Sequence, residues 1–258
     1  MKELEVNPMR LARIMTPLQK RARITLLSAL ALVSLLAGTA TKAETGPALF
    51  PFEVSYNASM DKGLSLNGSA KRVLTSQGND VWLYRTDVNS FIADLDESLI
   101  LKWEDGRVIP LRYRYRLSGF LIRDRKQSID FDWKAGVATG EYRGKPFRIQ
   151  LEEGVLDPLG YQIQLHQDIR VGKREMEYQV LDRGKIDSER FAVVTDDVSR
   201  TDGGQASYLK AEKVRENSKR ETLMWFDPDN KYVLVRLLQV EPDGSRYQLS
   251  LKSMDLGD

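Results

Sequence analysis

The clearest pattern of hydrophobic and polar residues lies near the C-terminus, in ETLMWFDPDNKYVLVRLLQVEPDGSRYQLSLKSM at residues 221–254. Successive side chains of a β-strand point to opposite faces, so apolar residues at every second position indicate a strand with one buried face. Three such runs are separated here by the sequences DPDN at 227–230 and EPDG at 241–244. The stretch therefore predicts three antiparallel strands joined by two similar turns.

The two turn sequences also predict how the strands align. Proline suits the second position of the turn, aspartate suits the third, and asparagine or glycine tolerates a positive φ at the fourth. This is the pattern of a three-residue hairpin loop that closes on a left-handed residue. It places Asp227 opposite Lys231 and Glu241 opposite Ser245.

This alignment sorts the side chains of the three strands onto two faces. One face is apolar apart from a tyrosine and is expected to be core: Leu223, Trp225, Val233, Val235, Leu237, Tyr247, Leu249 and Leu251. The other face is apolar on its first two strands and polar on the third: Met224, Phe226, Tyr232, Leu234, Arg236, Leu238, Gln248, Ser250 and Lys252. We expect a second layer or a ligand to cover only the Phe226, Tyr232 and Leu234 side.

The same alternation recurs, less cleanly, from residue 52 to the C-terminal meander. It is clearest in LRYRYRL at 111–117 and in SIDFDW at 128–133. Turn sequences follow one another about every 8–15 residues, a spacing typical of antiparallel sandwiches and barrels. The chain is therefore predicted to be mostly β, with roughly a dozen strands in a single antiparallel curled sheet or barrel-like sandwich.

One segment breaks the two-residue period. Asp157 is a good N-cap, Pro158 suits the first helical position, and the apolar residues that follow have helical spacing. We predict one substantial helix over Pro158–Ile169, ending near Gly172, and expect it to pack on one face or mouth of the sheet.

The N-terminal segment predicts export. Basic residues at 20–23 precede an apolar run from Ile24 to Ala37, and small residues lie at the −3 and −1 positions before Ala40 and Ala43. This pattern indicates a secretory signal peptide over residues 1–43, cleaved after Ala43 or Ala40, that leaves one β-rich periplasmic domain over 44–258. The alternative is an uncleaved anchor, but the run of about 14 residues is shorter than the roughly 20 that a spanning helix needs.

Charge and cysteine content narrow the function classes. Residues 1–43 hold seven Lys/Arg and two Asp/Glu, so removing them changes the net charge from +2 to −3. The mature chain therefore gives no argument for a nucleic-acid partner. The chain has no cysteine, which excludes disulfides and a thiol nucleophile. No cofactor is expected, and the partners considered are a lipid, a glycan or an envelope protein.

Few residues suggest catalysis or metal binding. His166 is the only histidine, and without cysteine it does not fit a zinc site. The sequence has no Gly-x-Ser-x-Gly motif for a nucleophilic serine, so His166 is expected to be an ordinary, partly exposed residue of the helix. Carboxylates cluster at 94–97 and at 130–132 and could bind Ca²⁺ or act as an acid/base pair. Such positions are more often the solvent face of a half-exposed strand.

Two sets of residues are the candidate binding residues. Arg112, Arg114 and Arg116 share one face of a strand and could hold a phosphate or carboxylate. The alternative for this row is a solvated face with cross-strand ion pairs. The second set is the apolar group Met224, Phe226, Tyr232 and Leu234, for which the alternative is core packing.

Four features in this order resemble a known family of exported bacterial proteins, domain of unknown function 3108. They are FPFEVSY at 50–56, Gly106 with Pro110 and the Tyr113-Arg114-Tyr115 strand, Asp157-Pro158-Leu159 before the helix, and TLMWFDPDNKYVLVRLLQVEPDGSRYQLSL at 222–251. The resemblance covers nearly all of Phe50–Lys252, although Val233-Leu234-Val235-Arg236 stands where the family commonly has a proline. It implies export and a β-rich fold, and it implies no activity, substrate or catalytic residue.

Three functions remain open at this point. The first is a non-enzymatic periplasmic protein that binds an apolar or amphipathic ligand, or an envelope component, within a curved sheet. The second is an envelope assembly partner that uses an exposed strand edge or the arginine row. The third is a glycan or lipid hydrolase with paired carboxylates.

Overall fold

The computed structural model describes residues 47–257 apart from 62–64, 92, 121–122, 202–203 and 217–218, and apart from the side chains of 65–66 and 195–206. The expected signal peptide, residues 1–43, lies outside the described residues, so export of the chain stays a prediction. Within the described part, no helix has the length and apolar character needed to cross a bilayer.

Nearly all of the described chain forms strands, with one α-helix and one short 3-10 turn. In chain order the elements are β1 (Phe52–Asp61), β2 (Ser65–Gly78), β3 (Val81–Ser90), β4 (Asp94–Glu104), β5 (Arg107–Ser118), β6 (Arg125–Asp132), β7 (Val137–Tyr142), β8 (Lys145–Gln150), α1 (Gly160–Arg170), β9 (Glu175–Asp182), β10 (Lys185–Thr201), β11 (Gly204–Val214), β12 (Glu221–Asp227), η1 (Pro228–Asn230), β13 (Val233–Val240) and β14 (Arg246–Leu256).

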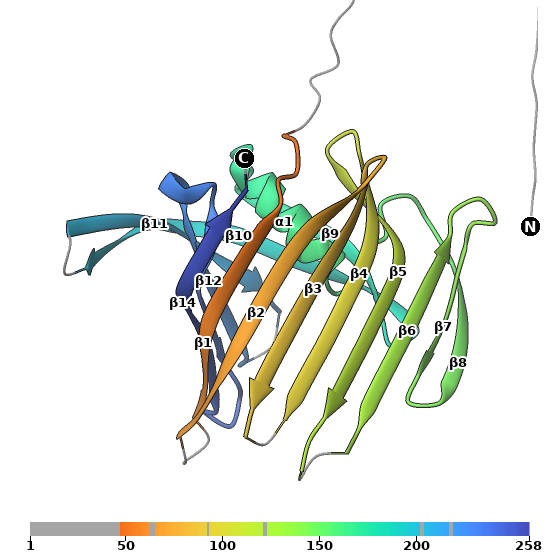
Figure 1. Ribbon diagram of the computed structural model, residues 1–258, viewed down its shortest axis with the longest axis horizontal. Helices are drawn as coiled ribbons and strands as arrows, with labels where there is room; N and C mark the ends of the chain where they lie inside the picture. The colour runs from red at the N-terminus through yellow and green to blue at the C-terminus, as the bar shows by residue number, and fades with distance from the viewer. Residues whose placement is uncertain are drawn as a thin grey trace, which may run out of the picture. The chain divides into compact units, whose positions relative to one another are not determined.

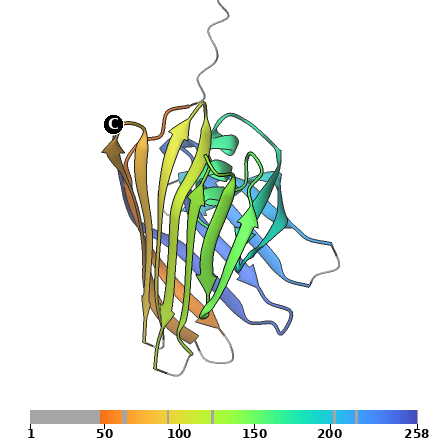
Figure 2. The same cartoon turned by 90° about the vertical axis from the view of Figure 1, so that its right-hand side faces the viewer.

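The strands form one antiparallel sheet of 14 strands in the order β8-β7-β6-β5-β4-β3-β2-β1-β14-β13-β12-β11-β10-β9. The sheet curls so that its two halves face each other across an interior (Figure 1 and Figure 2). This confirms the predicted single curled antiparallel sheet, with slightly more strands than the expected dozen. Consecutive strands pair with each other except β8 and β9, and β1 pairs with β14, which brings together the two ends of the described chain.

Several tight turns set the alignment of neighbouring strands. Asp105-Gly106, Arg143-Gly144 and Arg183-Gly184 have positive φ at both residues. Two left-handed residues in a two-residue loop are the hallmark of the hairpin turn whose twist matches that of its strands. Glycine at the second position allows this conformation at no steric cost.

The sheet is curled but open, with β8 and β9 at its two ends. The ends still approach each other, because a Cβ atom added to Gly184, in the β9–β10 turn, would lie 3.0 Å from the ring of Phe147 on β8. Leu156 covers part of the β9 edge with two backbone hydrogen bonds, one to the carbonyl of Gln179 at 2.9 Å and one from the amide of Leu181 at 2.8 Å. The gap between the end strands β8 and β9 is therefore covered by side chains and by the short bridge that Leu156 forms with β9.

The inner face of the curl carries the main hydrophobic core. One row of opposed residues crosses five strands, and all of its members are buried: Leu74, Tyr84, Leu99, Tyr113 and Ile129. The alternation predicted for LRYRYRL is confirmed for Tyr113, Tyr115 and Leu117, which lie inside, and for its arginines, which lie outside. Leu111 falls at an irregularity, because Ile100 pairs with Arg112 and Leu101 with Pro110.

Helix α1 lies at one end of the curl (Figure 1). It begins at Gly160, two residues later than predicted, but Asp157 still caps it, because its Oδ1 accepts hydrogen bonds from the amides of Leu159 at 2.9 Å and Gly160 at 3.1 Å. The side chain of Gln164 accepts from the Val108 amide at 2.9 Å, and Asp168 accepts from the Tyr178 hydroxyl at 2.8 Å. These bonds hold the helix against β5 and β9.

The second predicted turn of the C-terminal meander is confirmed. Gly244 has φ +83°, and the Glu241 amide donates to the Ser245 carbonyl at 2.8 Å. From there Val240 pairs with Arg246 and Leu237 with Leu249, which is the predicted alignment of β13 with β14.

The first predicted turn is wrong. Pro228–Asn230 forms a 3-10 turn, the left-handed residues are Lys231 and Tyr232, and Asp227 pairs with Val233 instead of Lys231. The loop is longer than a three-residue hairpin because the Asp227 side chain accepts from the Asp229 amide at 3.0 Å and starts a helical turn.

An irregularity in the β12–β13 pairing also changes the two predicted faces. Phe226 pairs with Leu234, but Trp225 pairs with Arg236, so Val235 is an extra residue that reverses the alternation along β13. Leu237 therefore lies on the inner face with Met224 and Phe226, and Arg236 and Leu238 lie on the face of Trp225. The two predicted faces are thereby corrected from Arg236 onward. Because β14 keeps its alignment with β13, Tyr247, Leu249 and Leu251 change face with Leu237, and Gln248 and Ser250 change face with Leu238 and Arg236.

The expected cover over the Phe226, Tyr232 and Leu234 side is confirmed, and the face of Trp225 is buried as well, as expected of core. Met224 and Phe226 belong to the main core, whereas Trp225, Val233 and Val235 belong to a smaller cluster with Val54 and Tyr56 on β1.

Candidate functional site

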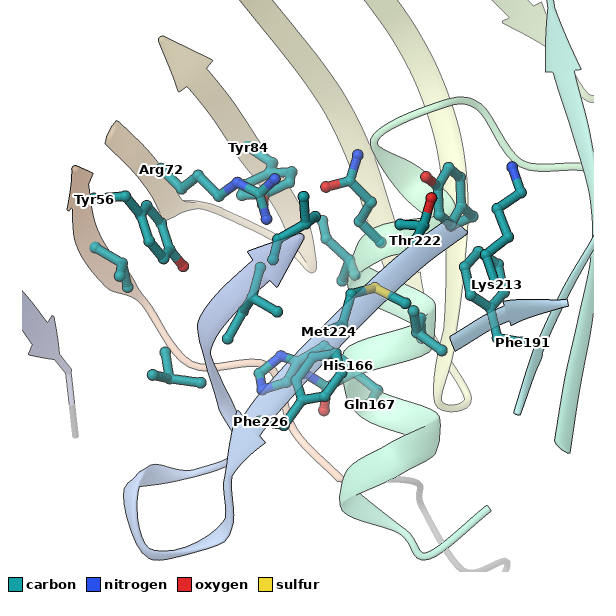
Figure 3. Close-up of a pocket in the computed structure, with 18 of the residues that line it drawn as sticks. Tyr56, Arg72, Tyr84, His166, Gln167, Phe191, Lys213, Thr222, Met224 and Phe226 are labelled. Carbon is teal, nitrogen blue, oxygen red and sulfur yellow. The ribbon is translucent and has the colours of Figure 1, made fainter. Parts of the chain in front are cut away.

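A cavity of about 260 Å³ lies inside the curl, between α1 and the two facing halves of the sheet (Figure 3). Its walls combine apolar and aromatic side chains with a few charged and polar ones. The lining residues come from β1–β3, from α1 and from β10–β13: Phe52, Val54, Tyr56, Arg72, Leu74, Tyr84, Tyr161, Gln162, Ile163, Leu165, His166, Gln167, Phe191, Lys213, Arg215, Arg220, Thr222, Met224, Phe226, Val233, Leu234, Leu237 and Gln239.

Three of the four apolar candidate residues reach this cavity. Met224, Phe226 and Leu234 line it, while Tyr232 packs against the main core without lining it. Met224 and Phe226 lie on β12, and Leu234 lies on β13. The bulge at Val235 brings Leu237 onto the same inner face. The structure thus brings most of this set to one wall, and their role in binding a ligand stays a prediction.

Arg72 is the charged group on the opposite wall. It lies on the inner face of β2, between Tyr56 and Tyr84 (Figure 3), and its guanidinium carbon is 5.8 Å from the centre of the Tyr56 ring. Its Nε is enclosed and has no hydrogen-bond partner. Burial lowers the pKa of Arg72, but Tyr84, Tyr56 and Glu97 outweigh it and hold that pKa above its ordinary value, so the side chain is cationic.

The nearest acidic residue in the row of Arg72 is Glu97, and Thr86 separates the two. Arg72 pairs with Thr86 on β3, and Thr86 pairs with Glu97 on β4. Two strand spacings correspond to roughly 9–10 Å. Glu97 instead accepts a hydrogen bond from the Tyr113 hydroxyl at 2.6 Å, and burial raises the pKa of this carboxyl. Glu97 is therefore poorly placed to neutralise Arg72.

Three more cations line the cavity from β11 and the start of β12. Lys213 forms an ion pair with Glu189, and Arg220 pairs with Glu241 at 2.6 Å. Arg215 donates to the Thr222 hydroxyl at 3.0 Å. Within the described part of the chain, no carboxylate lies within the ion-pair distance of 4.0 Å from either Arg72 or Arg215.

Helix α1 contributes His166 and Tyr161 to the wall. His166 is half-buried, and its Nε2–H donates to the Lys231 carbonyl at 2.9 Å, which joins the helix to the β12–β13 turn. Burial lowers the pKa of His166 to about 4, so the ring is neutral near pH 7. Tyr161 stacks on Phe191 at 5.5 Å. These residues shape the cavity, and their contacts do not include a nucleophile held by His166.

A second cavity, of about 300 Å³, lies further from the helix. It is lined mainly by small and apolar residues near the far ends of β1–β5 and β13–β14, such as Ala58, Val88, Leu95 and Leu117. Leu237 lines both cavities, so the two adjoin at this side chain. Ligand pockets typically enclose roughly 300–1,000 Å³. The first cavity alone is small, and the two together fall within that range.

The arginine row lies on the outer face, away from the cavity. Arg112 and Arg114 both pair with Asp130 on β6, at 3.1 Å and 2.9 Å, with side chains 58% and 39% exposed. Arg116 lies opposite Lys126 in the same ladder. The structure therefore does not bring the arginine row and the apolar candidates into one site.

The carboxylate clusters are similarly divided. Asp96 lies outside and pairs with Arg85 at 2.8 Å, whereas its neighbour Glu97 points inside. Asp130 is held by the two arginines. No group of three or more His, Asp or Glu side chains is placed to hold a metal ion within the described ranges.

The sequence prediction missed Arg72, Tyr56 and Tyr84. One signal was present, because Ala70, Arg72 and Leu74 alternate on one face of β2, and a single charge on an apolar strand face is unusual. The cations at 213, 215 and 220 carried no such signal, since their segment is rich in charges of both signs.

Comparisons with known proteins agree with the fold and name no activity. The family model "Protein of unknown function (DUF3108)" matches residues 52–252. A β-barrel-like DUF1849 protein from Brucella abortus is similar in structure, with 11% identity, a TM-score of 0.54, and coverage of 82% of this chain and 100% of that chain. A DUF1329 protein from Desulfovibrio piger matches with 10% identity over 83% of this chain and 87% of that chain, with a TM-score of 0.23. No curated protein matches.

Proposed function

The chain belongs to the DUF3108 family, and from that premise we propose that it binds an apolar or amphipathic ligand inside its curled sheet, without catalysing a reaction. The observation that carries this proposal is the interior cavity, which holds open space in the middle of an otherwise close-packed core. Apolar pockets with a few convergent polar groups are the usual form of small-molecule sites.

The similar β-barrel-like structure supports the proposal only at the level of fold. Curled sheets that enclose a cavity are a common scaffold for ligands. The site of action is proposed to be the periplasm, because the N-terminal pattern of basic residues, apolar run and small residues is that of a signal peptide. Cell fractionation with an antibody to the mature chain tests this location.

Two neighbouring leucines provide a matched pair of variants for testing the cavity. Leu237 lines both cavities, and Leu238 points to the opposite face of the same strand. Leu237→Trp adds a large ring where the cavities adjoin, whereas Leu238→Trp adds the same ring outside them. The probe is N-phenyl-1-naphthylamine, an uncharged dye whose fluorescence rises in apolar sites.

We expect saturable dye binding by the wild type and by Leu238→Trp, and binding weakened about 10-fold or more in Leu237→Trp. Thermal unfolding of both variants controls for overpacking, which costs about 1–3 kcal/mol in a well-packed core. Equal binding by both variants, or no binding by the wild type, would overturn the proposal.

A further inference from the structure

The interior of the curl holds more positive than negative charge at the cavity. Four cations line it, and only two of them, Lys213 and Arg220, have a carboxylate in ion-pair contact. Arg72 and Arg215 come from different halves of the sheet and lack such a partner among the described side chains. The cavity therefore has two arginines whose charge the protein does not neutralise.

An unneutralised charge in a protein interior is costly. Removing an ion from water costs several kcal/mol even after relaxation, unless a partner and hydrogen bonds compensate. The Tyr56 ring offers a weak cation–π contact to Arg72, but the enclosed Nε has no acceptor. A negatively charged hydrogen-bond acceptor on a bound ligand would both compensate the charge of Arg72 and accept a hydrogen bond from its Nε–H.

We propose that the ligand is an amphiphile with an oxyanion head, a carboxylate or a phosphate, whose head pairs with Arg72 and whose hydrocarbon tail runs past Leu237 into the second cavity. This inference rests on the proposed binding function and adds the chemical class of the ligand. A planar guanidinium matches both kinds of head, because it donates two parallel hydrogen bonds to two oxygens.

The surroundings of Arg72 suit an oxyanion. Tyr56 lies on one side and Tyr84 on the other (Figure 3). Burial raises the pKa of the Tyr56 phenol, so its hydroxyl keeps its proton and can donate to an oxyanion. The described residues that line this cavity include no carboxylate to repel a negative head.

The path for the tail is apolar. From the Arg72 end, the walls continue past Tyr56 and Leu237 to the second cavity, where Val88, Leu95 and Leu117 lie. Among the described residues, those that line the second cavity include no charged side chain. A head held at Arg72 thus leaves an uncharged route for a single hydrocarbon chain.

The test measures displacement of N-phenyl-1-naphthylamine by three compounds with the same chain and different heads: dodecanoate, dodecyl phosphate and dodecanol. Acetate and inorganic phosphate are the heads without a tail. The proteins are the wild type, Arg72→Met, Arg72→Lys and the control Arg85→Met, which removes an arginine of the outer face that pairs with Asp96.

We expect the wild type to bind at least one of the two anionic compounds about 30-fold more tightly than dodecanol, the effect of pairing one buried charge. Arg72→Met should lose this preference and still bind the dye, Arg72→Lys should keep part of it, and Arg85→Met should behave as the wild type. Which anionic compound binds more tightly identifies the head as carboxylate or phosphate.

Three results would overturn the inference. Dodecanol binding as tightly as both anions in the wild type, with the dye still bound, removes the head site but leaves the proposed function intact. Acetate or inorganic phosphate binding as tightly as the long-chain anions shows a site for a free anion. No dye binding at all defeats the proposed function itself. The head comparison in the wild type holds even if Arg72→Met fails to fold.

Discussion

Arginines on the two faces of the sheet differ in their exposure and in their ion-pair partners. On the outer face, Arg112 and Arg114 are well exposed and share Asp130. On the inner face, Arg72 is half-buried with an enclosed Nε, contacts the Tyr56 ring and has no carboxylate in ion-pair contact among the described residues. The outer arginines have the partners that folding needs, whereas the inner arginine has an unused hydrogen-bonding group beside open space.

This contrast indicates that Arg72 is more informative about function than the arginines of the outer face. Exposed ion pairs are worth about 0–1 kcal/mol and are common on any protein surface. A charge held inside a hydrophobic core is costly, so its presence needs a cause other than stability. The regular arginine row is conspicuous in the sequence, but it lies away from the cavity, whereas Arg72 lines the cavity from an otherwise apolar strand face.

The largest expected effect concerns the packing of the inner face. Leu99 is fully buried in the row that crosses β2–β6, and its neighbour Ile100 faces outward and is half-buried. Leu99→Ala should lower the free energy of unfolding by about 2–5 kcal/mol, and Ile100→Ala by clearly less. Urea unfolding of the two variants checks this, and equal losses would contradict the assignment of the faces.

The next effect concerns Asp157, an acid buried at the helix N-terminus. Burial raises its pKa to about 7, against the backbone hydrogen bonds that lower it. The folded state then holds a proton that the unfolded state releases near pH 4, so this group stabilises the fold below pH 4 and loses that contribution between pH 4 and 7. The expected loss is about 1.4 kcal/mol per pH unit.

Asp157→Asn keeps the capping oxygen and removes the titration. The variant should match the wild type near pH 4 and exceed it in stability by a few kcal/mol at pH 8. His166, whose lowered pKa gives the opposite trend between pH 4 and 6.5, is common to both proteins, so it cancels in the difference. A constant difference from pH 4 to 8 would show that Asp157 does not titrate in this range.

A smaller effect is expected when the inner charge is replaced by an apolar group. Arg72→Met should change the free energy of unfolding of the ligand-free protein by no more than about 1–2 kcal/mol, because the desolvation that it relieves is offset by the lost interactions with Tyr84, Tyr56 and Glu97. A thermal melt of delipidated protein measures this. A larger destabilisation would mean that Arg72 holds Tyr56 and Tyr84 in place for the fold itself.

The smallest effect belongs to the outer face. Arg85→Met breaks the exposed pair with Asp96 and should change stability by no more than about 1 kcal/mol, with the difference shrinking at high salt. Melts at 20 mM and 500 mM NaCl check this. A larger, salt-independent loss would remove the contrast between the two faces.

Much of the fold was open to prediction from the sequence because its signals are local. Asp157-Pro158 fixes the start of the helix through its own hydrogen bonds, and the EPDG turn fixes the alignment of β13 with β14. The β12–β13 alignment was not predictable in the same way, since Val233–Leu238 is apolar on both faces apart from Arg236. A one-residue bulge in such a run costs little burial, and no polar position reveals it.

The site was only partly predictable, for a related reason. Met224, Phe226 and Leu234 were found because their apolar face exceeded what one core layer needed. Arg72 becomes a neighbour of these residues only when the sheet curls and brings its two halves together, and no local pattern encodes that approach. The arginine row was selected by its regularity, which is the mark of a solvent-facing strand.

The most direct test of the interior binding site is native mass spectrometry of the wild type, Leu237→Trp and Leu238→Trp purified from the periplasm without detergent. We predict that the wild type and Leu238→Trp each carry one bound amphiphile that is released on unfolding, and that Leu237→Trp carries none. Three proteins with the same bound mass, or a wild type that is empty, would contradict it.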